Sequence, residues 1–354
     1  MRTLRLFAAR PPDLPQSTAW YLADLGEARG KQELFTRQSP QRLKALREHA
    51  IIESAVSSNR IEGVTVERSR IGTLVFGKPL LRDRNEEEVR GYRDALKLIH
   101  EQGTELTPDE ATVLRLHALS RRQGFDAGRY KERPSDIIER YPDGRERIRF
   151  KTVVPGETPA ALRETLKLFS DGLEERRTYP LLLVGGMNLD FLCIHPFRDG
   201  NGRVSRLLLL LQCYHLGFEV GRYISLERLI EENKDRYYET LEQSSQGWHD
   251  SRHDPWPYTN FLLYILKTAY QEFENRLGDM TSPRGAKAQA VREAVRRQIG
   301  EFRLTDIEDA CPGVGRDWIR QILTQMKAAG ELRCQGRGRG SRWHYLPNEG
   351  SNSE

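Results

Sequence analysis

The nine residues from His195 to Arg203 bring together side chains that suit phosphate chemistry. His195 can serve as a general base near neutral pH, since the ordinary pKa of imidazole is about 6.5. Asp199 supplies the hard oxygen ligands that Mg²⁺ prefers when it is shared with phosphate groups. Arg203 and Arg206 are three residues apart, so on a helix they lie on one face and can bind one polyphosphate chain. Taken singly, His195 would more often be structural and Asp199 would be a helix cap, but the combination favours a reactive site.

Two helices are predicted to position this segment. Residues 179–194 are apolar enough to form a buried helix that ends just before His195. Pro196 cannot continue that helix, and the two glycines that follow permit backbone angles closed to other residues. A second, leucine-rich helix is predicted over Arg203–Leu216, and Phe197 is expected to point inward and hold the turn. The N–H groups and the positive dipole end at a helix N-terminus make such a turn an anion-binding site.

The residues from His195 to Arg206 match the motif HPFx(D/E)GNGRxxR in full, and on this motif the chain resembles the Fic (Fido) family. The resemblance covers roughly residues 85–277. It implies a mainly α-helical catalytic core with one β-hairpin, and an enzyme that transfers AMP from ATP to a hydroxyl group of a protein. A branch of the family that phosphorylates its targets carries lysine at the position of Gly202, so the resemblance argues against that activity.

The resemblance also implies roles for individual residues. His195 would take the proton from a serine, threonine or tyrosine hydroxyl, and Asp199 would hold Mg²⁺ against the phosphates. ATP would be bound by Pro196, Phe197, Arg198, Asp199, Gly200, Asn201, Gly202, Arg203, Arg206, Asn233 and Tyr237. Asn233 and Tyr237 occupy positions at which family members line the binding site of the adenine and ribose. The alternative is that Tyr237 and Tyr238 are ordinary core residues of a helix.

A β-hairpin is predicted before the motif. Residues 136–139 and 147–153 are short β-type runs that flank Tyr141-Pro142-Asp143-Gly144, a sequence typical of a tight turn. The resemblance implies that this hairpin, near residues 148–153, is the flap that aligns the target segment by strand addition.

A second motif precedes the catalytic core. The sequence Ser58-Asn59-Arg60-Ile61-Glu62-Gly63 fits the inhibitory pattern (S/T)xxxE(G/N) of the same family, at the end of a helix predicted over Pro40–Ile61. Its position, N-terminal to the core, resembles the second regulatory class of the family (class II). Glu62 would then pair with Arg206 and occupy the cation meant for the γ-phosphate, and Ser58 would be the first residue of the inhibitory motif. The alternative is a helix end whose Glu62 is merely solvated.

The C-terminal part of the chain is basic. Residues 284–345 hold 13 Lys and Arg against seven Asp and Glu, a net charge of +6, whereas the whole chain carries +5. Helices over Ala286–Ile299, Thr305–Ala310 and Asp317–Ala329, followed by a Gly- and Arg-rich hairpin over Glu331–Tyr345, form the outline of a winged helix. DNA is expected to contact the third helix and the wing through Arg316, Arg320, Arg337, Arg339 and Arg342. A protein-contact or dimer module is the alternative.

Length and composition limit the remaining alternatives. A chain of 354 residues, 38% hydrophobic and 30% charged, is long enough for about two domains and can bury a core. It contains no apolar run of about 18 residues, so no membrane span is expected. The four cysteines form no CxxC pair, which favours a reducing cytoplasm. The expected domains are residues 1–84 with the inhibitory helix, 85–280 as the catalytic core, and 286–346 as the winged helix.

Outside the motifs, the N-terminal residues up to about Arg37 are expected to be irregular, with a short helix near Ala19–Leu25. Further helices are predicted over Asn85–Gln102, Thr107–Arg121, Pro159–Arg176, Leu226–Ser244 and from Asp254 to about Leu277, with a linker at Thr281–Gly285. Two patterns are interpreted as decoys. Gly72–Lys78 fits GxxxxGK but is followed by Pro79 instead of Ser or Thr, so a loop is expected. His249 and His253 are expected to lie in a surface loop and not to bind metal.

The sequence therefore predicts a protein adenylyltransferase that is autoinhibited by Glu62, with ATP as substrate and Mg²⁺ as cofactor. Its expected partners are a target protein with a hydroxyl side chain, the enzyme itself through self-modification, DNA, and a second copy in a homodimer. One alternative is a DNA-binding regulator whose core senses nucleotide; the intact His195 weighs against it, because a pure sensor needs no base. The other is an enzyme that removes AMP from modified proteins, with Glu62 positioning water.

Overall fold

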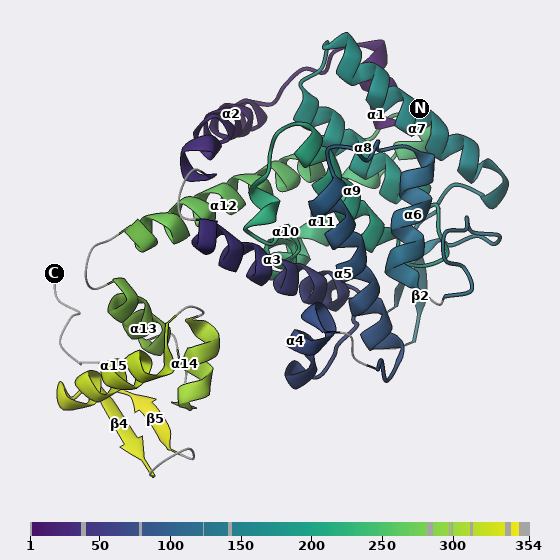
Figure 1. Ribbon diagram of the computed structural model, residues 1–354. Coiled ribbons are helices and arrows are strands. Elements are labelled where there is room, and N and C mark those ends of the chain that lie inside the picture. The colour runs from purple at the N-terminus through teal and green to yellow at the C-terminus, as the bar shows by residue number, and fades with distance from the viewer. Residues whose placement is uncertain are drawn as a thin grey trace. The chain divides into compact units, whose positions relative to one another are not determined.

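The computed structural model describes residues 2–36, 40–77, 80–122, 124–140, 144–281, 286–296, 298, 300–311, 314–336 and 341–346. Its contacts divide the chain into two units, residues 1–273 and 274–354. The described residues are mainly helical, with two small antiparallel sheets, which confirms the predicted fold class. Figure 1 shows the elements in chain order.

The first unit is built from helices and one hairpin. Its α-helices are α1 (Thr3–Ala9), α2 (Gln16–Thr36), α3 (Pro40–Ile61), α4 (Arg68–Phe76), α5 (Arg84–Gln102), α6 (Glu110–Arg121), α7 (Thr158–Glu175), α8 (Pro180–Ile194), α9 (Asn201–His215), α10 (Leu226–Glu232), α11 (Lys234–Ser245) and α12 (Trp256–Thr281), the last of which extends beyond residue 273. Short 3₁₀ turns lie at Pro155–Glu157, Val220–Arg222 and Trp248–Asp250. The helices predicted over residues 40–61, 85–102, 107–121, 159–176, 179–194 and 203–216 are thereby confirmed, with ends that shift by up to three residues.

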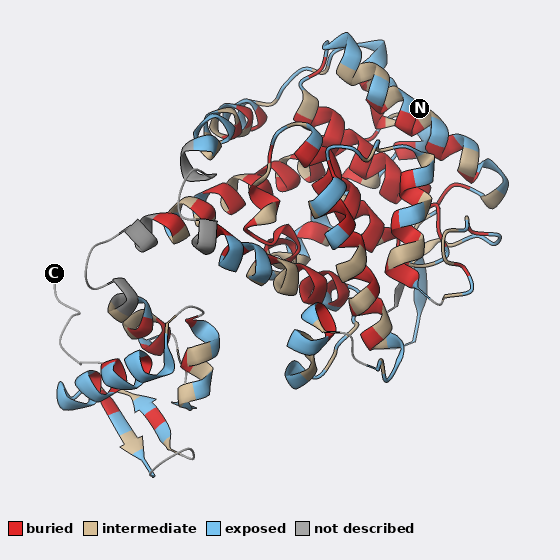
Figure 2. Cartoon of the chain, viewed as in Figure 1, coloured by how far each residue is buried: buried red, intermediate tan, exposed pale blue. Residues whose placement is uncertain are grey.

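Helices α8 and α9 form the centre of this unit. Every residue of α8 after Pro180 is buried, and so are nearly all residues of α9, as the red ribbons in Figure 2 show. α8 packs against α1, α7 and α9, while α9 also contacts α5 and α6. Burial of each large apolar side chain is worth about 1.5–3 kcal/mol, so this pair is a rigid support for the turn between its two helices.

The hairpin is formed by β1 (Ile137–Arg140) and β2 (Glu146–Phe150), which pair antiparallel with Ile138 opposite Ile148. This confirms the predicted hairpin. Its turn residues 141–143 lie outside the described residues.

The N-terminal region differs from its sequence-based prediction, and this is the first of three corrections. Residues up to 37 were expected to be mostly irregular, yet they form α1 and the long helix α2. The carboxylate of Asp190 accepts hydrogen bonds from the backbone N–H groups of Thr3 (2.9 Å) and Leu4 (3.0 Å), and so caps α1 from a distant part of the chain. α2 is fixed in a similar way, since Asp24 pairs with Lys267 of α12 (2.6 Å). Neither partner is local, so residue pattern alone could not indicate these helices.

The second correction concerns residues 226–244, which were predicted as one helix. The chain breaks at Asn233 into α10 and α11, because the backbone there leaves the helical region (φ −114°, ψ 32°). The Asn233 side chain donates to the carbonyl of Leu229 (2.8 Å), a local bond that competes with the helix.

The two decoy patterns are also only partly as expected. Residues 72–76 lie in α4 and not in a loop, and Lys78 is outside the described residues. His249 is exposed as predicted, but His253 is buried, with its Nε2 atom 2.9 Å from the Thr3 hydroxyl. No group of three or more His, Cys, Asp or Glu able to hold a metal ion occurs among the described residues.

The second unit contains α13 (Ala286–Arg296), α14 (Leu304–Ala310), α15 (Arg316–Ala328), and three antiparallel strands in the order β3 (Glu301–Phe302), β5 (Arg342–Tyr345), β4 (Leu332–Gln335). Its own core includes Val295, Ile319, Leu323 and Trp343. The three helices and the hairpin are confirmed, β3 was not foreseen, and the winged-helix class stays a prediction.

DNA binding by this second unit also stays a prediction. Arg316 and Arg320 of α15 are exposed, but they pair with Glu308 (3.4 Å) and Asp317 (3.1 Å). Arg337 and Arg339 lie outside the described residues, as does most of the expected linker, residues 282–285.

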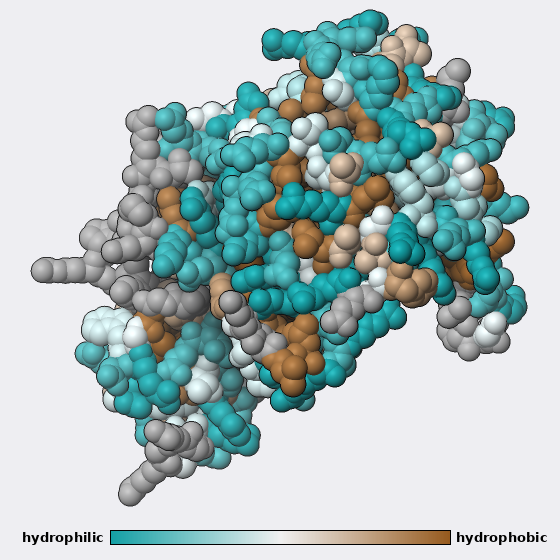
Figure 3. All heavy atoms as spheres, turned by 45° about the vertical axis from the view of Figure 1, so that its right-hand side comes forward, coloured by the Kyte–Doolittle hydropathy of each residue, from teal (hydrophilic) through white to brown (hydrophobic). Residues whose placement is uncertain are grey.

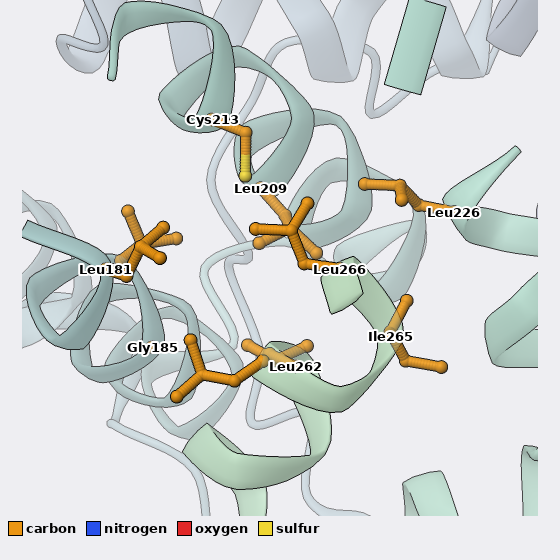
Figure 4. Close-up of a pocket in the computed structure, with 10 residues that line it drawn as sticks. Leu181, Gly185, Leu209, Cys213, Leu226, Leu262, Ile265 and Leu266 are labelled. Atoms are coloured by element: carbon orange, nitrogen blue, oxygen red, sulfur yellow. The ribbon is translucent and has the colours of Figure 1, made fainter. Parts of the chain in front are cut away.

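Beyond the motif, the described residues form a largely hydrophilic surface and enclose a small apolar cavity. Hydrophilic side chains cover much of the face shown in Figure 3, and none of the described helices combines the length and hydropathy that a membrane span requires. A small cavity lies between α8, α9, α10 and α12 (Figure 4). Its labelled lining residues are apolar, such as Leu181, Leu209 and Leu226, apart from Cys213. Burial raises the pKa of the Cys213 thiol to about 12, so the thiol is protonated and unreactive at neutral pH.

Gly91 gives a direct test of the packing of α5 on α6. A Cβ atom at Gly91 would lie 2.4 Å from the carbonyl oxygen of Leu119 and 2.8 Å from that of Ser120, closer than any real contact. We expect Gly91→Ala to lower the free energy of unfolding by about 1–3 kcal/mol, because the two helices must separate. Gly30→Ala in α2 is the control: a Cβ there meets nothing within 4 Å, so the change should be neutral or slightly stabilising. Urea unfolding of both variants measures the difference, and equal midpoints would contradict the prediction.

Candidate functional site

His195 lies at the end of α8 and is partly exposed. Its backbone is left-handed (φ 53°, ψ 62°), which is uncommon for a residue with a side chain. Nδ1 lies 3.2 Å from the carbonyl of Leu192 and must donate there, so Nε2 keeps its lone pair in the neutral ring. Burial lowers the pKa of His195 to about 4, helped by the nearby charge of Lys131. The residue is therefore a neutral imidazole with a free acceptor at neutral pH.

The turn after His195 is braced by its own side chains. Asn201 accepts from the backbone N–H of Phe197 (2.9 Å) and donates to its carbonyl (2.8 Å). The buried Phe197 ring stacks on His117, with centroids 3.7 Å apart, so the expected inward orientation of Phe197 is confirmed. His117 accepts from the N–H of Gly128 (3.0 Å) and, through Nε2, donates to the carbonyl of Asp199 (3.0 Å). His117 lies on α6, far from the motif in sequence, and the motif itself gave no signal for it.

The start of α9 has a backbone conformation that suits an anion, and anion binding there stays a prediction. Gly200 has a positive φ of 86° and the helix begins at Asn201, two residues earlier than predicted. A Cβ atom at Gly202 would lie 2.3 Å from Oε1 of Glu62. The Glu62 carboxylate therefore occupies the space directly over Gly202, where an anion at the helix N-terminus would lie.

Arg206 and the end of α3 form a buried charge contact. Nη2 of Arg206 donates to Oε1 of Glu62 (2.8 Å) and to the carbonyl of Ser58 (2.9 Å), while Nε donates to the Ser58 hydroxyl (2.9 Å). Arg206 is only 3% exposed, whereas Glu62 is 33% exposed. Burial alone would lower the pKa of Arg206, but the Glu62 carboxylate raises it above its ordinary value. Nη1 has no hydrogen-bond partner among the described atoms, so a buried donor remains available to an anion.

Arg203 is directed elsewhere. It is 1% exposed and pairs with the buried carboxylate of Glu88 on α5 (2.8 Å), with weaker contacts to Asn59 and Asp199 at 3.4 Å. Arg203 and Arg206 start from one face of α9, as predicted, but their guanidinium groups have different partners. In this structure Arg203 joins α9 to α5, and only Arg206 reaches the carboxylate over Gly202.

Asp199 is the expected metal ligand, and it is surrounded by arginines. Its Oδ2 accepts from Arg84 (2.9 Å) and Arg121 (2.9 Å), and its Oδ1 lies 3.4 Å from Arg203. Burial would raise the pKa of this carboxyl, yet Arg203 and Arg121 hold it below its ordinary range. The carboxylate is 46% exposed. One ionised, accessible carboxylate fits Mg²⁺, because this ion commonly takes one or two protein carboxylates and completes its shell with substrate phosphates and water.

The remaining expected residues lie around this centre. Arg198 is exposed, with its guanidinium carbon 5.1 Å from the centroid of the Phe125 ring. Asn233 caps the break between α10 and α11. Tyr237 is buried among Tyr258, Phe261 and Tyr238, which is the arrangement expected of helix core. A nucleotide contact by Asn233 or Tyr237 stays a prediction.

Together, these groups can deprotonate a hydroxyl beside a bound anion. The neutral Nε2 of His195 accepts the proton, and the α9 N-terminus with Arg206 supplies positive charge. Sequence reasoning missed Arg84, Glu88 and Arg121, which lie on α5 and α6 and fix the charges of the turn.

Residues 106–213 match the family model of the Fic/DOC family. The chain is 25% identical over 248 residues to "Protein adenylyltransferase Fic" of Nematostella vectensis. This match covers 67% of this chain and 53% of that protein. It spans about half the length of the curated relatives it matches. Among solved structures, a Fic family protein from Desulfovibrio desulfuricans G20 is 22% identical with a TM-score of 0.60, covering 97% of this chain and 99% of that one. Fic-1 from C. elegans is 20% identical with a TM-score of 0.54, covering 78% and 81%. These two likenesses concern the fold.

Proposed function

We propose that this chain, which carries a Fic/DOC domain, is a protein adenylyltransferase that moves AMP from ATP to a serine, threonine or tyrosine hydroxyl of a protein. The observation that carries the proposal is the neutral His195, whose Nδ1 is engaged by Leu192 and whose ring interacts electrostatically with Glu62 and Asp199, six residues before α9 begins. Gly202 lies in the first turn of α9, so no lysine is present at that position.

The chemistry follows from these positions. Nε2 of His195 takes the proton of the target hydroxyl as its oxygen attacks the α-phosphorus of ATP. A new oxygen–phosphorus bond forms, the bond from the α-phosphorus to its bridging oxygen breaks, and pyrophosphate leaves. Arg206 and the N–H groups of the α9 N-terminus stabilise the negative charge on the phosphates. Asp199 would hold Mg²⁺, which supplies further charge stabilisation to the transferring phosphates.

We further propose that Glu62 inhibits this reaction. Its carboxylate occupies both Arg206 and the space over Gly202, so the γ-phosphate must displace it before ATP can bind in a reactive position. Glu62 directly follows α3, and α3 is held by the buried Glu227 of α10, whose carboxylate accepts from Ser54 (2.6 Å) and from Tyr92 of α5 (2.9 Å). The inhibitory position of Glu62 is therefore built into the packing of the core.

The test is the transfer of label to protein from ATP labelled at its α-phosphate, with Mg²⁺ present, for the natural chain and for Glu62→Gly. We expect protein-bound label, including label on the enzyme itself through self-modification. ATP labelled at the γ-phosphate is the control and should leave protein unlabelled. Label from γ-labelled ATP, or none from α-labelled ATP despite measured ATP binding, would contradict adenylyl transfer.

Removal of AMP from a modified protein is the second candidate. It is favoured by the partial exposure of Glu62, whose carboxylate reaches solvent beside the anion site and can orient a water molecule. Release of labelled AMP from a previously modified protein, lost on Glu62→Gly, would support this activity.

The pH dependence follows from the lowered pKa of His195. Because the base is active when neutral and its pKa is about 4, it stays neutral above about pH 6 and becomes protonated only below about pH 5. We therefore expect kcat of Glu62→Gly to stay within about twofold between pH 6 and pH 8, and to fall about tenfold per pH unit below the pKa. Rates at saturating ATP across this range, with thermal melts to confirm folding, provide the check. An acid limb with its midpoint near pH 6.5 would show that the base has its ordinary pKa.

A further inference from the structure

The left-handed backbone of His195 requires support from its surroundings. A residue with a Cβ atom pays a steric cost at φ 53°, and such a conformation persists only where neighbouring groups fix it. The direction of the imidazole ring depends on this backbone conformation, because the side chain is attached to the Cα atom whose φ angle is strained. The peptide groups on either side of His195 are therefore the points at which its orientation is set.

Lys131, in the segment between α6 and β1, is hydrogen-bonded to the peptide group before His195 and to the peptide group that follows Pro196. Its side-chain Nζ donates to the carbonyl of Ile194 (3.1 Å), just before His195, and its backbone N–H donates to the carbonyl of Pro196 (3.0 Å), just after it. One residue thus fixes the carbonyl on each side of the strained position.

The Lys131 side chain is also unusually placed for a lysine. The residue is 3% exposed, and the hydrogen bonds that join its Nζ to described residues go to neutral oxygens, among them the Ile194 carbonyl. Its other hydrogen bond goes to the hydroxyl of Thr152 (2.8 Å), which in turn lies 3.5 Å from Oδ1 of Asp136. Burial lowers the pKa of Lys131 to about 8, which reflects the cost of placing an ammonium group there. A buried cation whose hydrogen bonds go to neutral oxygens is rare, and this one lies next to the base.

We propose that Lys131 is a positioning residue for the adenylyl transfer assigned above: through the Ile194 and Pro196 carbonyls it fixes the His195 backbone and so aims Nε2 at the target hydroxyl. The inference rests on the proposed function for its kinetic consequences only, since the orientation of His195 can be measured without turnover. Three charged groups face His195: Lys131 from its loop, Glu62 from the end of α3, and Asp199 from the turn before α9. The positive charge of Lys131 also favours the neutral imidazole.

The test compares Lys131→Met with Lys131→Gln, both in the Glu62→Gly background. Methionine keeps the length of the side chain but removes the donor and the charge, whereas glutamine keeps a donor without charge. We expect Lys131→Met to lower kcat about 10- to 100-fold while KM for ATP changes less than about twofold, because a small misalignment of a reacting group affects kcat more than binding. Lys131→Gln should recover a substantial part of kcat. Lys167→Met, at an exposed lysine of α7, is the control and should match the background.

A second readout is an NMR titration of His195 in the same proteins. Both Lys131 variants should raise the pKa of His195 because they remove a nearby cation, and Lys131→Met should also shift the resonances of the His195 ring.

A kcat of Lys131→Met within about twofold of the background, or a KM for ATP that rises as much as kcat falls, overturns the proposal. If Glu62→Gly itself transfers no AMP, the proposed function fails, and unchanged His195 resonances in Lys131→Met would separately overturn the positioning role. If Lys131→Met does not fold, Thr152→Val replaces it, with an expected three- to tenfold loss of kcat; no loss overturns the proposal.

Discussion

Replacement of Glu62 by glycine is expected to raise the rate of AMP transfer about 10- to 100-fold. The change removes the acceptor of one of the two hydrogen bonds of Arg206 Nη2 and empties the space over Gly202, where the carboxylate would otherwise lie. A hydrogen bond to a charged group is worth about 1.5–3 kcal/mol, and each 1.4 kcal/mol is a factor of ten, which sets the expected range. The affinity for ATP should rise by part of the same factor, because ATP must displace Glu62 from Arg206 when it binds to the natural chain.

The measurement is the initial rate of label transfer from α-labelled ATP, together with ATP binding by calorimetry. Glu62→Gln separates charge from size and should give an intermediate rate. Arg60→Gly is the matched control, since Arg60 is exposed on the last turn of α3 and its side chain, among the described residues, forms one long ion pair with Glu231, at 3.9 Å. Its rate should equal that of the natural chain. Equal rates for Glu62→Gly and the natural chain, with ATP bound in both, would mean that Glu62 is not inhibitory.

The packing of α3 bears on how the proposed inhibition by Glu62 would be relieved. Glu227 accepts hydrogen bonds from Ser54 of α3 and Tyr92 of α5, and all three side chains are buried. Removal of α3 from the core would break the hydrogen bond from Ser54 to the buried Glu227 and the packing of α3 against α5 and α10, which is costly. Under the proposed inhibition, we therefore expect relief through movement of the Glu62 side chain just after α3, not through separation of the whole helix from the core. Glu62 is one-third exposed, so a partner at the surface can reach it.

The elements that the sequence predicted well are those with local signals. α3 begins at a proline and shows helical spacing of its apolar residues, and its bounds agree with the prediction. α8 is an apolar run that must end at Pro196. By contrast, α1 depends on Asp190, 187 residues away from Thr3, and α2 on Lys267 of α12. A local pattern cannot contain such partners, so these helices were out of reach of sequence reasoning.

The same limit applies to the candidate site. The motif supplies residue types and spacing, and on that basis Glu62 was expected to pair with Arg206, a contact that is present at 2.8 Å. The motif could not indicate that Arg203 would be directed to Glu88, or that Arg84 and Arg121 would surround Asp199. Ion pairs between distant segments depend on tertiary packing. Arginine and carboxylate are abundant in this chain, so composition leaves many pairings open.

Replacement of His195 by alanine in the Glu62→Gly background should lower the rate of AMP transfer about 10²- to 10⁴-fold, the contribution typical of a general base. The structure separates this effect from binding, because the anion contacts come from Arg206 and the α9 N-terminus, while the His195 ring contacts Leu192. ATP affinity should therefore change less than about twofold, and the loss should lie in kcat. His215→Ala is the control, since His215 is exposed at the far end of α9 and its Nε2 contacts the carbonyl of Leu106. A His195→Ala enzyme that keeps its kcat would require a different base. Among the described residues near the site, His117 is the other imidazole, and both of its nitrogens are engaged in hydrogen bonds.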